Sequence, residues 1–133
     1  MTIYRRELTV EERFNYPAYH FGDFFPFRVE PFIFDLAGRL SRDYQGGYWN
    51  MYELPSGGFY MAPDSDTPFH VSCMNGYEGT LSADAFGVTV CMYTYSHLSF
   101  SPNMAEVCTE QYHLLREYLF QHPEVRAILA AID

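Results

Sequence analysis

Lysine is missing from this chain of 133 residues, and all eight of its basic side chains are arginines. Without lysine there is no P-loop lysine for phosphate, no Schiff-base lysine and no Ser/Lys nucleophile pair. Basic residues are also few against 17 acidic ones, so the formal net charge is −9. Binding to DNA or to an anionic membrane relies on a surplus of cations, which this composition does not supply.

Long apolar runs are absent too, since no stretch approaches the ~20 residues of a membrane span. The N-terminal residues MTIYRRELTVEER carry charges with no apolar stretch behind them, which is not the pattern of a secretory signal. The three cysteines, Cys73, Cys91 and Cys108, form no C-x-x-C pair. Free, buried thiols in a cytoplasmic protein are therefore the expectation.

Aromatic residues are abundant instead, at 19% of the chain, and together with 48% hydrophobic residues they predict one domain with a ring-rich core. Period-two patterns after residue 47 predict a three-stranded antiparallel meander. Its strands are expected over residues 48–54, 58–63 and 69–74. The predicted class is α+β, a small sheet covered by four or five helices over residues 10–16, 31–44, 82–99, 103–121 and 123–131.

Helix boundaries are indicated by caps and breakers. Thr9 with Glu12 forms a capping box, and Pro17 is expected to interrupt the helix that follows. Gly46 and Gly47 are expected to stop the second helix. Ser82 resembles an N-cap, with Asp84 in the first turn, where the helix dipole favours a carboxylate.

The 82–99 segment is ambiguous, because its centre VTVCMYTY has the composition of a strand. Its length and its cap favour a helix, and a helix that is apolar all round is expected to be buried. Asn103 with Glu106 forms a second capping pattern, ahead of the most regular helix.

Motifs for catalysis or metal binding are weak. The five histidines show no H-E-x-x-H spacing, and no serine lies in a G-x-S-x-G elbow. Neither a metal nor a cofactor is expected. A thiol enzyme that uses Cys91 or Cys108 is a remote alternative, because no histidine is paired with either residue in the sequence.

Two surface features are candidates for partner contact. Glu106, Glu110 and Glu117 lie within ~40° of one another on a helix and form an acidic stripe that is able to imitate a row of phosphates. In the segment DYQGGYW, residues 43–49, Tyr44, Tyr48 and Trp49 flank two glycines. Exposed aromatics on a turn are good partner anchors, and they serve equally well as lids on a small core.

Two longer stretches carry a resemblance to a known family. Residues 40–63, LSRDYQGGYWNMYELPSGGFYMAP, resemble the signature segment of the ArdB/KlcA antirestriction proteins. Residues 76–90, GYEGTLSADAFGVTV, resemble the second signature, which centres on L-S-A-D-A. The C-terminal segments YHLLREY and HPEVRAI fit as well, whereas the first 30 residues match least.

The resemblance implies an accessory protein of plasmids, phages or genomic islands that protects incoming unmodified DNA from host type I restriction enzymes. It implies action on the restriction complex or on its DNA translocation through protein contact, without direct DNA binding, and it implies no catalytic residues and no cofactor. The candidate partner-binding residues are Tyr44, Gln45, Tyr48, Trp49 and Asp84. The alternative is a DNA mimic that acts through the acidic stripe.

Overall fold

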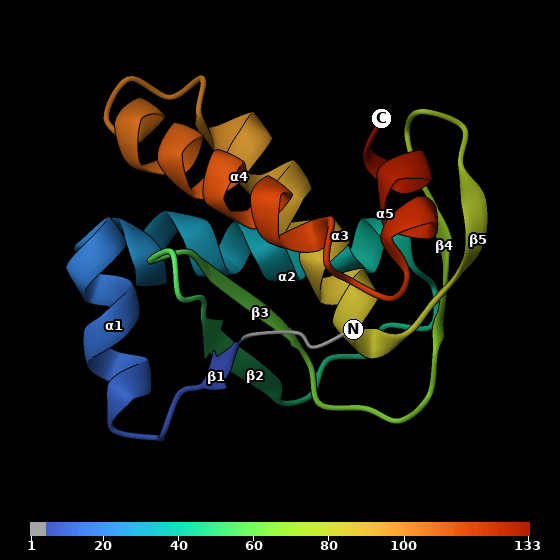
Figure 1. Ribbon diagram of the computed structural model, residues 1–133, viewed down its shortest axis with the longest axis horizontal. Coiled ribbons are helices and arrows are strands. Elements are labelled where there is room, and N and C mark those ends of the chain that lie inside the picture. The colour runs from blue at the N-terminus through green and yellow to red at the C-terminus, as the bar shows by residue number, and fades with distance from the viewer. Residues whose placement is uncertain (1–4) are drawn as a thin grey trace.

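Helix α3 (Ala83–Leu98) is the central element of the fold, which is known from a computed structural model that describes residues 5–133 (Figure 1). It packs against strand β3 (Phe59–Pro63), α2 (Glu30–Leu40), α4 (Ala105–Leu119) and α5 (Val125–Ile132). Most of its side chains are buried, as expected for a helix that is apolar all round. The hydroxyls of Thr89 and Thr94 donate to the carbonyls of Ala85 and Val90, at 2.9 Å and 2.8 Å, so these polar groups are satisfied inside the helix.

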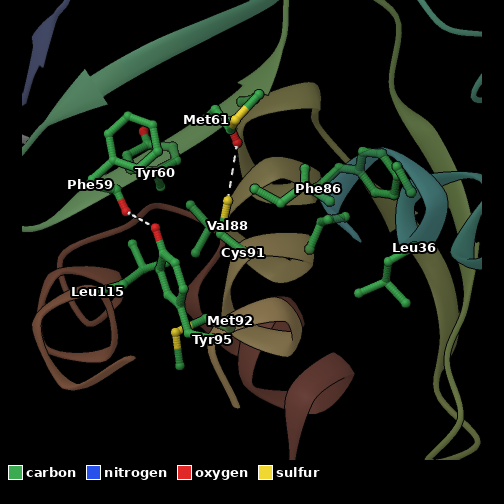
Figure 2. Close-up of a cluster of buried hydrophobic side chains, with 14 of the residues drawn as sticks. Leu36, Phe59, Tyr60, Met61, Phe86, Val88, Cys91, Met92, Tyr95 and Leu115 are labelled. Carbon is green, nitrogen blue, oxygen red and sulfur yellow. Dashed lines mark hydrogen bonds between the residues drawn. The ribbon is translucent and has the colours of Figure 1, made fainter. Parts of the chain in front are cut away.

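Strand β3 is an edge strand, and its open edge is covered by helices. The Tyr95 hydroxyl donates to the Phe59 carbonyl at 2.6 Å, and the Cys91 thiol donates to the Met61 carbonyl at 3.6 Å (Figure 2). From α4, Gln111 accepts the Phe59 N–H at 2.8 Å. Side chains of α3 and α4 therefore supply partners that a neighbouring strand would otherwise provide.

The first sheet has the order β1-β2-β3, with β1 at Arg6–Glu7 and β2 at Trp49–Glu53, both pairings antiparallel. The predicted hairpin of residues 48–54 and 58–63 is confirmed. The third predicted strand, 69–74, was wrongly placed in this sheet. Strand β4 (Phe69–Ser72) pairs instead with β5 (Glu78–Leu81) in a separate hairpin, because α3 and α4 occupy the edge of β3 that a third strand would need.

The helices match the prediction in number, with boundary corrections. Helix α1 is Glu12–Phe21, so Pro17 lies inside it and does not end it. Burial of Pro17 and Phe21 stabilises the continued helix against the loss of one backbone hydrogen bond. A π-helical turn, η1 (Phe25–Val29), then leads into α2.

Other helix ends also differ from expectation. Helix α2 ends at Leu40, because the backbone of Ser41 is extended, so the helix stops before the two glycines that were expected to end it. Gly46 and Gly47, with φ of 89° and 108°, instead allow the loop after the helix to turn. Helix α4 starts after Met104 with no side-chain cap, so the predicted Asn103 cap is wrong. The Thr9–Glu12 capping box is present, with reciprocal hydrogen bonds of 2.9 Å and 3.2 Å.

Figure 1 shows α1 at one end of the molecule and the β4–β5 hairpin at the other, with α3 between them. Within residues 5–133 no helix combines the length and the apolar character that a membrane span requires. The fold is thus α+β, as predicted, with two small antiparallel sheets arranged around one buried helix.

Gly87 allows α3 to approach β3 closely. A Cβ built at this position would lie 2.5 Å from the Met61 carbonyl oxygen and closer still to Ala62. We expect Gly87→Ala to lower the free energy of unfolding by about 1–3 kcal/mol, measured by urea denaturation, because the helix must move away from the strand. Gly38→Ala in α2 is the control, since its Cβ meets nothing within 4 Å, and it should stabilise slightly. Equal effects of the two changes would contradict this packing.

Candidate functional site

The second motif, L-S-A-D-A, lies where β5 ends and α3 begins, and Asp84 is the centre of a polar cluster there. Its carboxylate accepts hydrogen bonds from His122 Nε2 at 2.7 Å and from the Tyr60 hydroxyl at 2.9 Å. Arg5, from the segment that leads into β1, forms an ion pair with the same carboxylate. Asp84 thereby joins three parts of the chain that are remote in sequence.

A second contact, besides the one to Asp84, determines the tautomer of His122. The backbone N–H of Glu124 donates to His122 Nδ1 at 3.0 Å, so the ring proton resides on Nε2 and is donated to Asp84. The His122 side chain is only 3% exposed. The imidazole therefore acts as an oriented donor that holds the Asp84 carboxylate in place.

Ser82 is the N-cap of α3, as predicted, and its Oγ accepts from the Ala85 N–H at 3.1 Å. Glu124, just before α5, accepts from the Ser82 N–H at 3.0 Å and from its hydroxyl at 2.5 Å. The serine of the motif therefore caps one helix and ties it to the start of another.

The pKa of Asp84 shows which effect dominates in the cluster. Burial would raise it, but the hydrogen bond from His122 and the charge of Arg5 outweigh burial, so the pKa is below its usual value. Burial beside the same carboxylate raises the pKa of Tyr60, whose hydroxyl is 3.4 Å from that of Tyr118. The phenols therefore stay protonated and serve as hydrogen-bond donors.

Sequence reasoning identified Asp84 but none of its partners. Arg5, Tyr60, Tyr118 and His122 are scattered along the chain, and no spacing or motif connects them. They come together through the packing of α3 and α4 on β3, the contact of the α4–α5 connection with the start of α3, and the position of Arg5 beside Tyr60 and Asp84.

We expect Asp84→Asn to lower the free energy of unfolding at pH 7 by about 1–3 kcal/mol, because a charged acceptor of several hydrogen bonds is lost. The depressed pKa means that this contribution exists above about pH 4 and disappears as the pH falls through the folded-state pKa. Denaturation curves of both proteins should thus converge at acid pH. Asp35→Asn is the control, since Asp35 forms an exposed ion pair with Arg39 at 3.1 Å and should change little. A difference in stability that does not shrink as the pH is lowered would contradict this role of Asp84.

The first motif, residues 43–49, divides into buried and exposed parts. Trp49 is only 2% exposed; its Nε1–H donates to the Tyr44 hydroxyl at 3.1 Å, and its ring meets that of Phe34 in an edge arrangement at 5.5 Å. Of the two roles left open for the aromatic residues of this segment, partner anchor or lid on the core, Trp49 has the second, because the first residue of β2 points into the core. Tyr44 is half-buried against this ring.

The rest of this motif is exposed. Tyr48 is 56% exposed, and the Arg13 guanidinium lies 4.6 Å from the centre of its ring. Arg13 also donates to the Trp49 carbonyl at 2.7 Å, which holds α1 against the start of β2. Gln45 is exposed, and its Nε2 donates to the Arg42 carbonyl at 3.0 Å.

Trp49→Ala should lower the free energy of unfolding by about 3–5 kcal/mol, because it removes a buried indole and leaves a cavity. Tyr48→Ala, which truncates the exposed neighbour, should change thermal stability far less. Thermal melts followed by circular dichroism measure both. An unchanged melting temperature for Trp49→Ala would remove this side chain from the core.

The acidic stripe is exposed along α4, with Glu106, Glu110 and Glu117 all at the surface. His113 lies in the same line, since it is seven residues from Glu106 and therefore almost two full turns away. The carboxylates are accessible, but the row that they form is interrupted by an imidazole.

The cysteines are buried, and burial raises the pKa of Cys91 to about 12 and that of Cys108 to about 11. Neither carries appreciable thiolate at neutral pH, which argues against a thiol nucleophile. No group of three or more metal-ligating side chains comes together in the described part of the chain, residues 5–133.

Comparison with known proteins identifies the family to which this chain is similar. The family model described as "Antirestriction protein" matches residues 42–133. The chain is 34% identical to the antirestriction protein KlcA of Escherichia coli, covering 92% of this chain and 89% of KlcA. It is also 38% identical to the uncharacterized protein YafX of Escherichia coli K12, over 96% of this chain and 89% of YafX.

A solved structure agrees with these relatives, with a TM-score of 0.88 and 33% identity over 97% of this chain and 94% of the other. It comes from work on KlcA and ArdB, which are described as having a novel fold and antirestriction activity against type I DNA restriction systems in vivo but not in vitro. This chain belongs to the antirestriction protein family.

Proposed function

We propose that this protein protects incoming unmodified DNA by inhibiting host type I restriction–modification enzymes through protein contact, in the cytoplasm and without binding DNA itself. The observation that carries the proposal is the structural match over nearly the whole chain to a protein of the KlcA and ArdB group. Antirestriction activity against type I systems is what is described for that group.

The chemistry of the chain supports an inhibitor that acts on protein. With no lysine and a net charge of −9, its composition offers no surplus of cations for a phosphate backbone. The buried thiols with raised pKa values, and the use of His122 and Asp84 to hold each other, favour a non-enzymatic role.

Within this proposal, the exposed part of the first motif is the candidate contact region. The side chains of Tyr48 and Gln45 are exposed to solvent. Half-buried Tyr44 lies beside them in the motif and is held by the hydrogen bond from buried Trp49. Asp84, at 25% side-chain exposure, is occupied by Arg5, Tyr60 and His122, so its contribution to partner binding is through the shape of the surface that it holds.

A second candidate function is DNA mimicry through the acidic stripe, favoured by the exposure of Glu106, Glu110 and Glu117 on one face of α4. The stripe is short, and its charges are separated by His113. Inhibition by mimicry depends on these three carboxylates, whereas inhibition through the first motif does not.

The test is phage plating. Unmodified phage is titred on a host with a type I restriction system, with and without this protein expressed, and we expect plating to recover towards the level of a restriction-free host. The test is done in cells because the activity described for KlcA and ArdB is observed in vivo but not in vitro.

Two comparisons make the result decisive. No recovery in the presence of folded protein would contradict the proposed function. Recovery that survives the simultaneous replacement of Glu106, Glu110 and Glu117 by Arg is the expected outcome and excludes mimicry through the stripe. Loss of recovery in this folded variant would establish the mimic and contradict contact through the first motif alone.

A further inference from the structure

An apolar groove of about 470 Å³ lies between the start of α1, the π-helical turn η1 and Tyr48. Its floor is formed by Phe25 and Met51, which are 6% and 3% exposed and belong to the core. Its rim carries Val10, Phe14 and Tyr48, which are 70%, 77% and 56% exposed. The groove thus combines a firm apolar floor with aromatic side chains that face solvent.

The ring of Phe14 on this rim is largely exposed. Phe14 lies on the same face of α1 as Pro17 and Phe21, but near the start of the helix, where it is 77% exposed while those two residues are buried. Single exposed apolar residues are common, but several that surround one apolar hollow are typical of a binding surface. The exposed ring of Phe14 is therefore available for contact with a partner.

Charge indicates what the groove accepts. Glu30 and Asp23 line it, and among residues 5–133 neither carboxylate has a side-chain hydrogen bond or an ion pair. Burial raises the pKa of Glu30, and the charge of Arg13 offsets this only in part. Arg13, the cation of the groove, is already engaged with Tyr48 and the Trp49 carbonyl. A carboxylate in such a setting is stabilised by a cation supplied from outside.

We propose that this groove binds a segment of a partner protein that inserts an apolar side chain between Phe14 and Tyr48 and places an arginine or lysine against Glu30 and Asp23. The identity of the partner as a host restriction enzyme rests on the proposed function. The chemistry of the bound segment is inferred from the groove alone and does not depend on the proposed function. Proteins that hold DNA carry basic segments for the phosphates, so such an enzyme has segments of this kind to offer.

The first experiment tests the chemistry of the groove with a defined probe. A synthetic peptide of alternating leucine and arginine is titrated into ¹⁵N-labelled protein, and its twin has glutamate in place of arginine. We expect shifts confined to residues 10–14, 23–30 and 48–51 with the arginine peptide and none with the glutamate peptide. Phe14→Ala and Glu30→Gln should each weaken binding about ten-fold or more.

Matched control variants are available elsewhere on the surface. Phe100→Ala removes a ring that is 85% exposed, and Asp66→Asn removes an exposed carboxylate between β3 and β4. Neither should change peptide binding. Absence of localised shifts, equal binding of both peptides, or equal effects of control and groove variants would overturn the proposal.

The second experiment places the double variant Phe14→Ala with Glu30→Gln in the plating assay. Where the unaltered protein protects phage, the double variant should lose at least ten-fold in plating, while Phe100→Ala with Asp66→Asn should retain full plating. Full protection by the groove variant would overturn the proposal and leave the proposed function intact. If the unaltered protein gives no protection, the proposed function fails, and the peptide titration alone decides the groove.

Sedimentation of the protein at rising concentration tests a competing occupant, a second copy of this chain. We expect the sedimenting mass to be the same for the unaltered protein and for Phe14→Ala at every concentration. A dimer that Phe14→Ala dissociates would overturn the proposal and assign the groove to self-association.

Discussion

The approach of α3 to the open edge of β3 is the contact on which the rest of this structure depends. Tyr95 and Cys91 supply donors to strand carbonyls, and Gly87 leaves room for the backbones to come together. An edge strand covered in this way does not pair further, so the next strand forms its own hairpin with β5. The same packing brings Asp84, at the start of α3, beside Tyr60 on β3. Core, sheet topology and polar cluster therefore have a common origin.

The two motifs that carry the family resemblance are largely devoted to this architecture. Ser82 caps α3, Asp84 gathers Arg5, Tyr60 and His122, and Trp49 is buried at the start of β2. These residues stabilise the fold that positions the surface, and their own side chains contribute little to that surface. Tyr48 is the exception, because it follows the glycine turn, lies over Arg13 and borders the groove at α1. The groove also draws on Phe14 and Glu30, from the part of the chain where the sequence resemblance is weakest.

Much of the fold was predictable from local patterns. The cap at Ser82, the capping box at Thr9, the β2–β3 hairpin and the buried helix after residue 82 all follow from short-range chemistry. Errors arose where tertiary packing overrides a local signal. Pro17 does not end α1, since its burial together with Phe21 compensates for a lost hydrogen bond. The sequence left open whether Trp49 faces a partner or the core, because alternation along a strand does not say which face is covered.

By itself the sequence determined the class of the fold, the absence of a lysine-based site, the acidic charge and the caps at Thr9 and Ser82. Each of these depends on composition or on residues within one turn of each other. The tertiary structure alone decided which strands share a sheet, which aromatic rings are buried, and that Asp84 meets His122, 38 residues away. It also decided that Phe14, Tyr48 and Glu30 border one groove. These outcomes depend on contacts between distant segments, and such contacts form only when the whole chain buries its apolar surface at once.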